Sequence, residues 1–75
     1  MKKKQINGYI YLMKRHILLK HPVVTITSKS IDEWFNYFNV KETLELDPEI
    51  ALHDDPYGWA EDIWQAICRE ENLKF

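Results

Sequence analysis

The sequence predicts a small α+β domain in which helices predominate. Two helix-capping patterns each precede apolar residues at helical spacing, and one run of β-branched residues is typical of a strand. The expected helices cover about residues 8–20, 31–39 and 56–71, and the expected short strands cover residues 23–27 and 43–46. An all-α fold and an N-terminal β-hairpin followed by helices are the two alternatives.

The segment from residue 8 to residue 20 allows two interpretations. Ile10, Met13 and Ile17 would share one face of a helix, whereas the alternating tyrosines also suit a strand. We favour the helix because most of the remaining residues are good helix formers. Pro22 discourages continuation of the helix beyond this segment.

The best strand candidate is residues 23–27, VVTIT, in which every residue is β-branched. A single strand leaves its backbone groups without hydrogen bonds, so we expect a partner strand. Residues 43–46 are one candidate, because Leu44 and Leu46 alternate with polar residues there. The N-terminal segment, if extended, is the other.

The second expected helix, residues 31–39, is preceded by a clear capping pattern. Ser30 and Glu33 have the spacing of a capping box, in which each side chain bonds to the other residue's free amide group. Trp34, Phe35 and Phe38 follow at helical spacing. Aromatic residues in such a stripe usually lie in the core, and we expect that here.

The third helix has the clearest local pattern. Asp55 suits the N-cap, and Pro56 suits the first helical position, where its missing N–H costs nothing. One face of this helix carries Ala60, Ile63, Trp64, Ile67 and Cys68. We expect this face in the core, with Glu61 and Asp62 in water.

The 75 residues suit one domain, 1–75, with residues 1–6 frayed at its start. Cys68 is the only cysteine, so the chain forms no internal disulfide, which fits a reducing cytoplasm. The apolar run after the N-terminal lysines is short and meets basic residues. We therefore expect no signal peptide and no membrane span.

Charge is divided unevenly along the chain. Residues 1–30 contain seven lysines and arginines and no acid, whereas residues 31–75 contain twelve acids and three bases. Such a division favours a charged partner. The alternative is that the two regions neutralise each other across the fold, as surface charges often do at little net energy.

No motif for catalysis or cofactor binding is present. With two glycines the chain has no glycine-rich phosphate loop. The histidines His16, His21 and His53 lack the clustering that a metal site requires. Cys68 lies on an apolar helix face and is expected to be buried and unreactive. We expect no enzymatic activity, no metal and no cofactor.

These observations favour a small inhibitor or adaptor that offers an acidic face with aromatic anchors to a basic protein. A nuclease or another nucleic-acid-binding protein is the expected partner, since acids can replace phosphates in its groove. Short inhibitors of this type are made by phages and mobile elements against host defence. The expected partner-binding residues are Glu42, Glu45, Asp47, Glu49, Asp54, Asp55, Tyr57, Trp59, Glu61 and Asp62.

Two other functions compete with this one. A nucleic-acid-binding regulator would use the basic N-terminal third to meet phosphates. Its binding residues would be Lys2, Lys3, Lys4, Lys14, Arg15 and Lys20. A homo-oligomer would instead pair the basic region of one copy with the acidic region of the next, in a head-to-tail contact.

Overall fold

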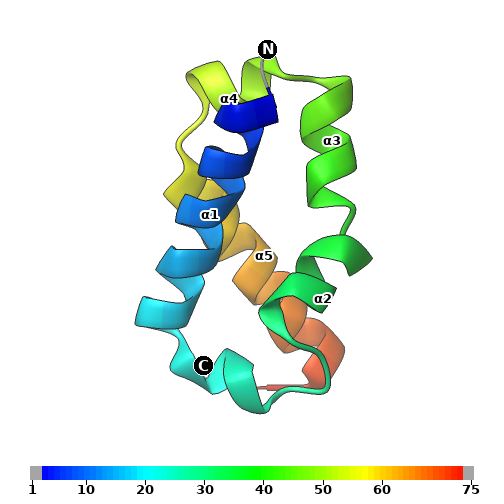
Figure 1. The fold of residues 1–75 in the computed structure, drawn as a ribbon. Coiled ribbons are helices and arrows are strands. Elements are labelled where there is room, and N and C mark those ends of the chain that lie inside the picture. Colours follow the sequence, from blue (N-terminus) through cyan, green and yellow to red (C-terminus); the bar gives the residue numbers. More distant parts are fainter. Residues whose placement is uncertain (1–2, 74–75) are drawn as a thin grey trace.

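A computed structural model describes the backbone of residues 3–73 and the side chains of residues 5–73. Throughout this part of the chain the ordered elements are helices, and it contains no strand. They are α1 (Lys3–Lys20), the short 3-10 helix η1 (Pro22–Ile26), α2 (Ile31–Tyr37), α3 (Val40–Leu46), α4 (Glu49–His53) and α5 (Pro56–Glu71) (Figure 1).

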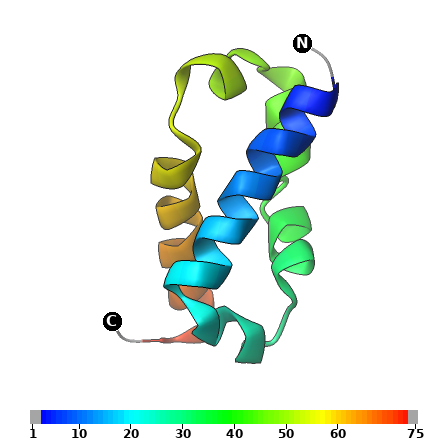
Figure 2. The same ribbon diagram turned by 60° about the vertical axis from the view of Figure 1, so that its left-hand side comes forward.

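The two long helices form the centre of the molecule. α1 packs along α5 and, on its other side, against α3. Figure 2 shows α1 in front, with α5 on one flank and α2 and α3 following each other along the opposite flank. η1 closes the end of the bundle where α1 ends, and α4 lies at the opposite end. The result is elongated, measuring 36 × 19 × 16 Å.

The core lies where the inward faces of these helices meet. Its largest fully buried side chains are Trp34, Met13, Ile17, Leu44, Ile67, Val24, Val40 and Cys68. They come from α1, η1, α2, α3 and α5, so each of these elements depends on the others for its packing. η1, α2 and α3 are too short to be stable alone, and the shared core therefore holds them in the fold.

α5 confirms the prediction for residues 56–71. The Asp55 carboxylate accepts a hydrogen bond of 3.0 Å from the Tyr57 amide, and Pro56 occupies the first turn. The five residues expected on the apolar face are all buried. At the other end Asn72 adopts a left-handed conformation with φ of 60°, which ends the helix.

The capping box of α2 is also confirmed. The Ser30 hydroxyl accepts from the Glu33 amide at 3.1 Å, and the Glu33 carboxylate accepts from the Ser30 amide at 3.0 Å. The helix ends at Tyr37, before the expected residue 39. Asn39 takes a left-handed conformation with φ of 56°, which separates α2 from α3.

α1 confirms the helical interpretation of residues 8–20 and extends further toward the N-terminus. It begins at Lys3, within the segment expected to be frayed, and Ile6 is already buried. Ile10, Met13 and Ile17 are buried together, as the helical spacing predicts. Met1 and Lys2 lie outside the described residues.

The predicted strand at residues 23–27 is wrong, because most of this segment forms η1. Pro22 sets the backbone for a helical turn, and the Val24 amide donates to the His21 carbonyl at 3.0 Å. The Thr25 hydroxyl then donates to the carbonyl of Pro22 at 2.9 Å. Local bonds of this kind satisfy the backbone without a neighbouring strand.

The predicted strand at residues 43–46 is wrong as well, because these residues belong to α3. Val40 and Leu44, four residues apart, are buried on one helix face, while Leu46 is 81% exposed. A strand would have placed Leu44 and Leu46 on the same side. The α+β class and the β-hairpin alternative are therefore both incorrect, and the all-α alternative describes the fold.

Candidate functional site

Three acids meet at the junction of α4 and α5. Asp54, Asp55 and Asp62 line a hollow of about 440 Å³. We call this hollow the acidic groove; its full lining is Ile50, Asp54, Asp55, Gly58, Trp59 and Asp62. Sequence reasoning had placed the acids and Trp59 in a binding surface but had missed Ile50 and Gly58.

The start of α5 positions most of this lining. One face of the helix carries Asp55, Gly58, Trp59 and Asp62. Going from Asp55 to Asp62 through either Gly58 or Trp59 takes one step of three residues and one of four, which is the spacing of a helix face. Asp54 is the C-cap of α4 and has extended backbone angles. The helix dipole favours carboxylates at this end of α5, which lowers the cost of gathering them.

The acids of the groove lack ion pairs with any described base. Among the side chains of residues 5–73, the only pair between a lysine or arginine and a carboxylate joins Lys14 Nζ to Asp32 Oδ1 at 2.8 Å. The side chains of Lys3 and Lys4, like the whole of Lys2, lie outside the described part. Within that part, this one pair is the only close contact between a lysine or arginine of the basic region and a carboxylate of the acidic region.

A second hollow, of about 360 Å³, adjoins the acidic groove at Asp54. We call it the apolar hollow; it is lined by Gln5, Gly8, Tyr9, Leu12, Ala51, Leu52, Asp54 and Pro56. Tyr9 also packs against Trp59 of the acidic groove, with their ring centroids 6.1 Å apart. Tyr9 therefore lines the apolar hollow and contacts one wall residue of the acidic groove.

The hydroxyl of Tyr9 is an exception to normal hydrogen bonding. The residue is 6% exposed, and its hydroxyl oxygen is buried without a hydrogen-bond partner within the described structure. Buried polar groups are nearly always bonded, so an unbonded one calls for an explanation. Burial raises the pKa of Tyr9, and the charges of Asp54 and Asp55 raise it further.

The other acids expected in the binding surface lie apart from this groove. Glu42 and Glu45 of α3 line a separate hollow of about 220 Å³. Asp47 and Glu49 are exposed, and Glu49 Oε2 lies 4.0 Å from His53 Nε2. The predicted surface is therefore divided, and one part of it forms a groove with an aromatic wall.

Glu61 takes part in an internal cluster instead. Its Oε2 lies 2.7 Å from His16 Nε2 and 2.9 Å from His21 Nε2, and the His21 ring stacks on Trp64 at 4.6 Å. We call Glu61, His16 and His21 the histidine cluster. Desolvation acts to raise the pKa of Glu61, but the hydrogen bonds from His21 and His16 outweigh it, so the pKa is lowered. This cluster joins α1 to α5.

Tyr57 also lies away from the acidic groove. Its ring centroid is 5.4 Å from that of His16. It lines a hollow of about 250 Å³ with Arg15 and Lys20 of α1. Tyr57 is thus among basic residues, contrary to the expectation that it would sit among acids.

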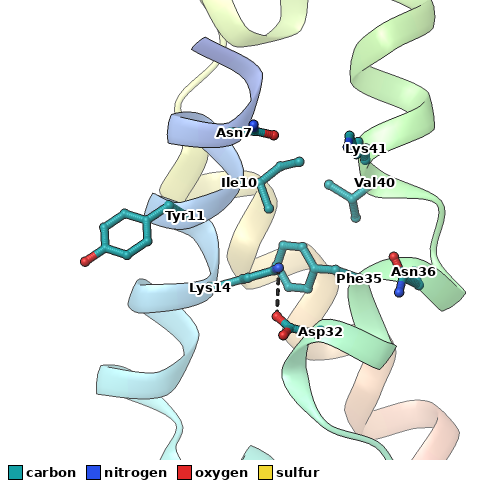
Figure 3. A pocket seen from close by; sticks show the side chains of 9 residues that line it. All are labelled: Asn7, Ile10, Tyr11, Lys14, Asp32, Phe35, Asn36, Val40 and Lys41. Carbon is teal, nitrogen blue, oxygen red and sulfur yellow. Dashed lines mark ion pairs between the residues drawn. The ribbon is translucent and has the colours of Figure 1, made fainter. Parts of the chain in front are cut away.

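Lys14 occupies a groove between α1 and the α2–α3 pair, of about 450 Å³ (Figure 3). Its ammonium group lies 5.5 Å from the centre of the Phe35 ring in addition to pairing with Asp32. The groove is lined by Asn7, Ile10, Tyr11, Lys14, Asp32, Phe35, Asn36, Val40 and Lys41. Lys14 is therefore partly buried and paired, and Arg15 and Lys20 are exposed among those bases of the alternative nucleic-acid set whose side chains are described.

Two features of the site had no usable signal in the sequence. The histidine cluster joins residues 45 and 40 positions apart, which only the folded chain brings together. The unbonded hydroxyl of Tyr9 likewise depends on tertiary packing. In contrast, the spacing of Asp55, Trp59 and Asp62 at the start of a helix was visible and would have placed them on one face.

The described residues contain no group of three or more histidine, cysteine or acidic side chains arranged to hold a metal ion. Nor does any helix among them have both the length and the apolar character needed to cross a membrane. Comparison of the chain with protein-family models found no match, and comparisons with curated proteins and with solved structures found none either.

Proposed function

We propose that the protein is a small non-enzymatic inhibitor or adaptor that binds a basic partner protein through the acidic groove. The single observation that carries this proposal is the convergence of Asp54, Asp55 and Asp62 beside Trp59, with no described base paired to them. Unpaired carboxylates attract a basic surface and orient it, while a partly exposed tryptophan provides an anchor.

The partner class follows from the same chemistry. Proteins that bind nucleic acid carry basic grooves built for a polyanion, and an acidic surface can occupy such a groove. A nuclease or related protein is therefore the favoured target, in a cytoplasmic setting. An origin among phage or mobile-element anti-defence proteins belongs to the same proposal.

The test removes charge from the groove without disturbing the helix cap. The variant Asp54→Asn/Asp55→Asn/Asp62→Asn loses three negative charges, and asparagine at position 55 retains capping ability. The matched control, Glu42→Gln/Glu45→Gln/Asp47→Asn, loses the same charge outside the groove. Each tagged protein is used to capture partners from lysate treated with nuclease, and the captured protein is then purified for direct binding and activity assays.

We expect the groove variant to bind the purified partner at least about tenfold more weakly, because three interacting charges are lost. The control should remain close to the original protein, and higher salt should weaken both. The purified partner should also lose activity when the original protein binds it. Equal binding by the two variants would rule out the acidic groove as the contact.

A second candidate, direct binding to nucleic acid, is favoured by the exposure of Arg15 and Lys20 beside Tyr57. When the capture is repeated with untreated lysate, this function would appear as binding that is present there and absent after nuclease treatment. Replacing Arg15 and Lys20 with glutamine would then weaken it, whereas the groove variant would not. Head-to-tail self-association would instead appear as an elution volume that changes with protein concentration.

A further inference from the structure

The acidic groove and the apolar hollow share Asp54, so they adjoin at the junction of α4 and α5, and we call the two together the recess. Three carboxylates face this recess, and Trp59 and Ile50 supply apolar surface. An isolated group of acids needs no ligand to explain it. The argument for a ligand rests on the second feature of the recess, the hydroxyl of Tyr9.

Tyr9 lines the recess next to Asp54 and packs against Trp59. Its hydroxyl is buried and makes no hydrogen bond to the described residues. Leaving such a group unbonded is unfavourable, because a buried polar group loses its hydrogen bonds to water without gaining others. A ligand that reached this oxygen with an N–H donor would remove the penalty, and the neighbouring acids favour a cationic ligand.

The arrangement suits a guanidinium better than an ammonium ion. A guanidinium is planar, carries five N–H donors and stacks on aromatic rings. It can therefore bond to two carboxylates, donate to a hydroxyl and lie against Trp59 at once. A lysine ammonium group has three donors on a compact, strongly hydrated charge, which makes such a division less favourable.

We propose that this recess is the subsite for a single arginine side chain of the partner, held by Asp54, Asp55 and Asp62, stacked on Trp59 and bonded to the Tyr9 hydroxyl. This inference rests on the proposed function and specifies which partner group the acidic groove recognises.

The test uses N-acetyl-arginine methylamide as the probe and N-acetyl-citrulline methylamide as its neutral counterpart of nearly the same shape. Each is titrated at low salt into the ¹⁵N-labelled protein, and amide and indole NMR signals are followed. We expect the arginine probe to shift the Trp59 indole and the Gly58 amide, with much smaller shifts from citrulline. N-acetyl-lysine methylamide should bind several-fold more weakly than the arginine probe.

Two variants separate the recess from general charge attraction. Tyr9→Phe removes only the hydroxyl, and because that group has no bond to lose, the fold should be unaffected. It should raise the Kd of the arginine probe by roughly fivefold, the loss expected for one hydrogen bond. The Asp54→Asn/Asp55→Asn/Asp62→Asn variant should abolish the shifts, whereas Glu42→Gln/Glu45→Gln/Asp47→Asn should preserve them.

Equal shifts from arginine and citrulline, or none from arginine, would overturn the subsite. So would an unchanged Kd in Tyr9→Phe. These results are distinguishable from failure of the proposed function. A partner whose capture depends on the acids of the groove, in a protein that ignores the arginine probe, would leave the function standing and reject only the arginine subsite.

Discussion

Glu61 and Asp62 are neighbours in α5, yet their surroundings differ completely. Glu61 faces α1 and accepts hydrogen bonds from His16 and His21. Asp62 lies in the acidic groove, where no described base pairs with it. One carboxylate connects two helices, and the next lines a hollow at the surface, where we propose that a partner binds.

This difference shows why a count of acids overstates a binding surface. The sequence places both residues in one long acidic region, and charge alone cannot separate them. What separates them is the 100° turn between successive residues of a helix, which sends one toward α1 and the other toward solvent. A test of the proposed binding surface should therefore expect substitution of Glu61 to affect stability and substitution of Asp62 to affect partner binding.

Reversing each charge in turn should give the largest contrast. Glu61→Lys removes the acceptor of two hydrogen bonds and places a cation beside two histidines. We expect it to lower the free energy of unfolding by about 2 kcal/mol. Asp62→Lys should change that free energy by less than about 0.5 kcal/mol and weaken partner binding. Urea unfolding measures the first effect, and direct binding measures the second.

The two substitutions serve as controls for each other, because both change the charge by the same amount on the same helix. If Asp62→Lys destabilised the protein as much as Glu61→Lys, the distinction between the inner and the outer acid would be lost.

Asp55 lines the acidic groove, as Asp62 does, but it also caps α5. Asp55→Ala removes the acceptor for the Tyr57 amide and should cost about 1 kcal/mol, whereas Asp55→Asn should cost only a few tenths. Both remove the charge, so both should weaken partner binding. Thermal unfolding of the two variants separates the cap from the charge, and equal melting temperatures would show that the cap contributes nothing.

Low pH should reduce the contribution of Glu61 to the stability of the fold, and this is the smallest of the expected effects. The pKa of Glu61 is lowered in the folded protein, so this carboxylate stabilises the fold above its ordinary pKa of 4.5. That contribution is lost as the pH falls through the lowered pKa. Because 39% of the side chain is exposed, we expect less than about 1 kcal/mol.

The measurement compares the original protein with Glu61→Gln between pH 7 and pH 3. The difference in unfolding free energy between the two should be constant near neutrality and shrink in acid. A difference that persisted unchanged at pH 3 would mean that the ionisation of Glu61 does not contribute.

Local signals predicted the parts of the fold that local interactions determine. The Asp55 cap and Pro56 placed the start of α5, and the Ser30–Glu33 box placed the start of α2. Each signal is a bond or a steric constraint within a few residues, so the sequence contains all of it. The acidic residues of the groove were named because they lie in the acidic part of the sequence, together with acids that the structure places elsewhere.

The errors arose where tertiary context overrides local preference. A β-branched run such as VVTIT favours a strand only when another strand can pair with it. Here Val24 packs into the helical core, and Pro22 with the threonine hydroxyls satisfies a short helical turn. The pairing of Glu61 with His16 and His21 depends on tertiary structure in the same way.

The buried thiol of Cys68 can report when α5 separates from the core. The residue is 1% exposed, and burial raises the pKa of its thiol, so the reactive thiolate is scarce while α5 is docked. A thiol-specific reagent can then label the chain only after α5 has separated from the core. Labelling under native conditions would measure how often that separation happens, without an introduced probe.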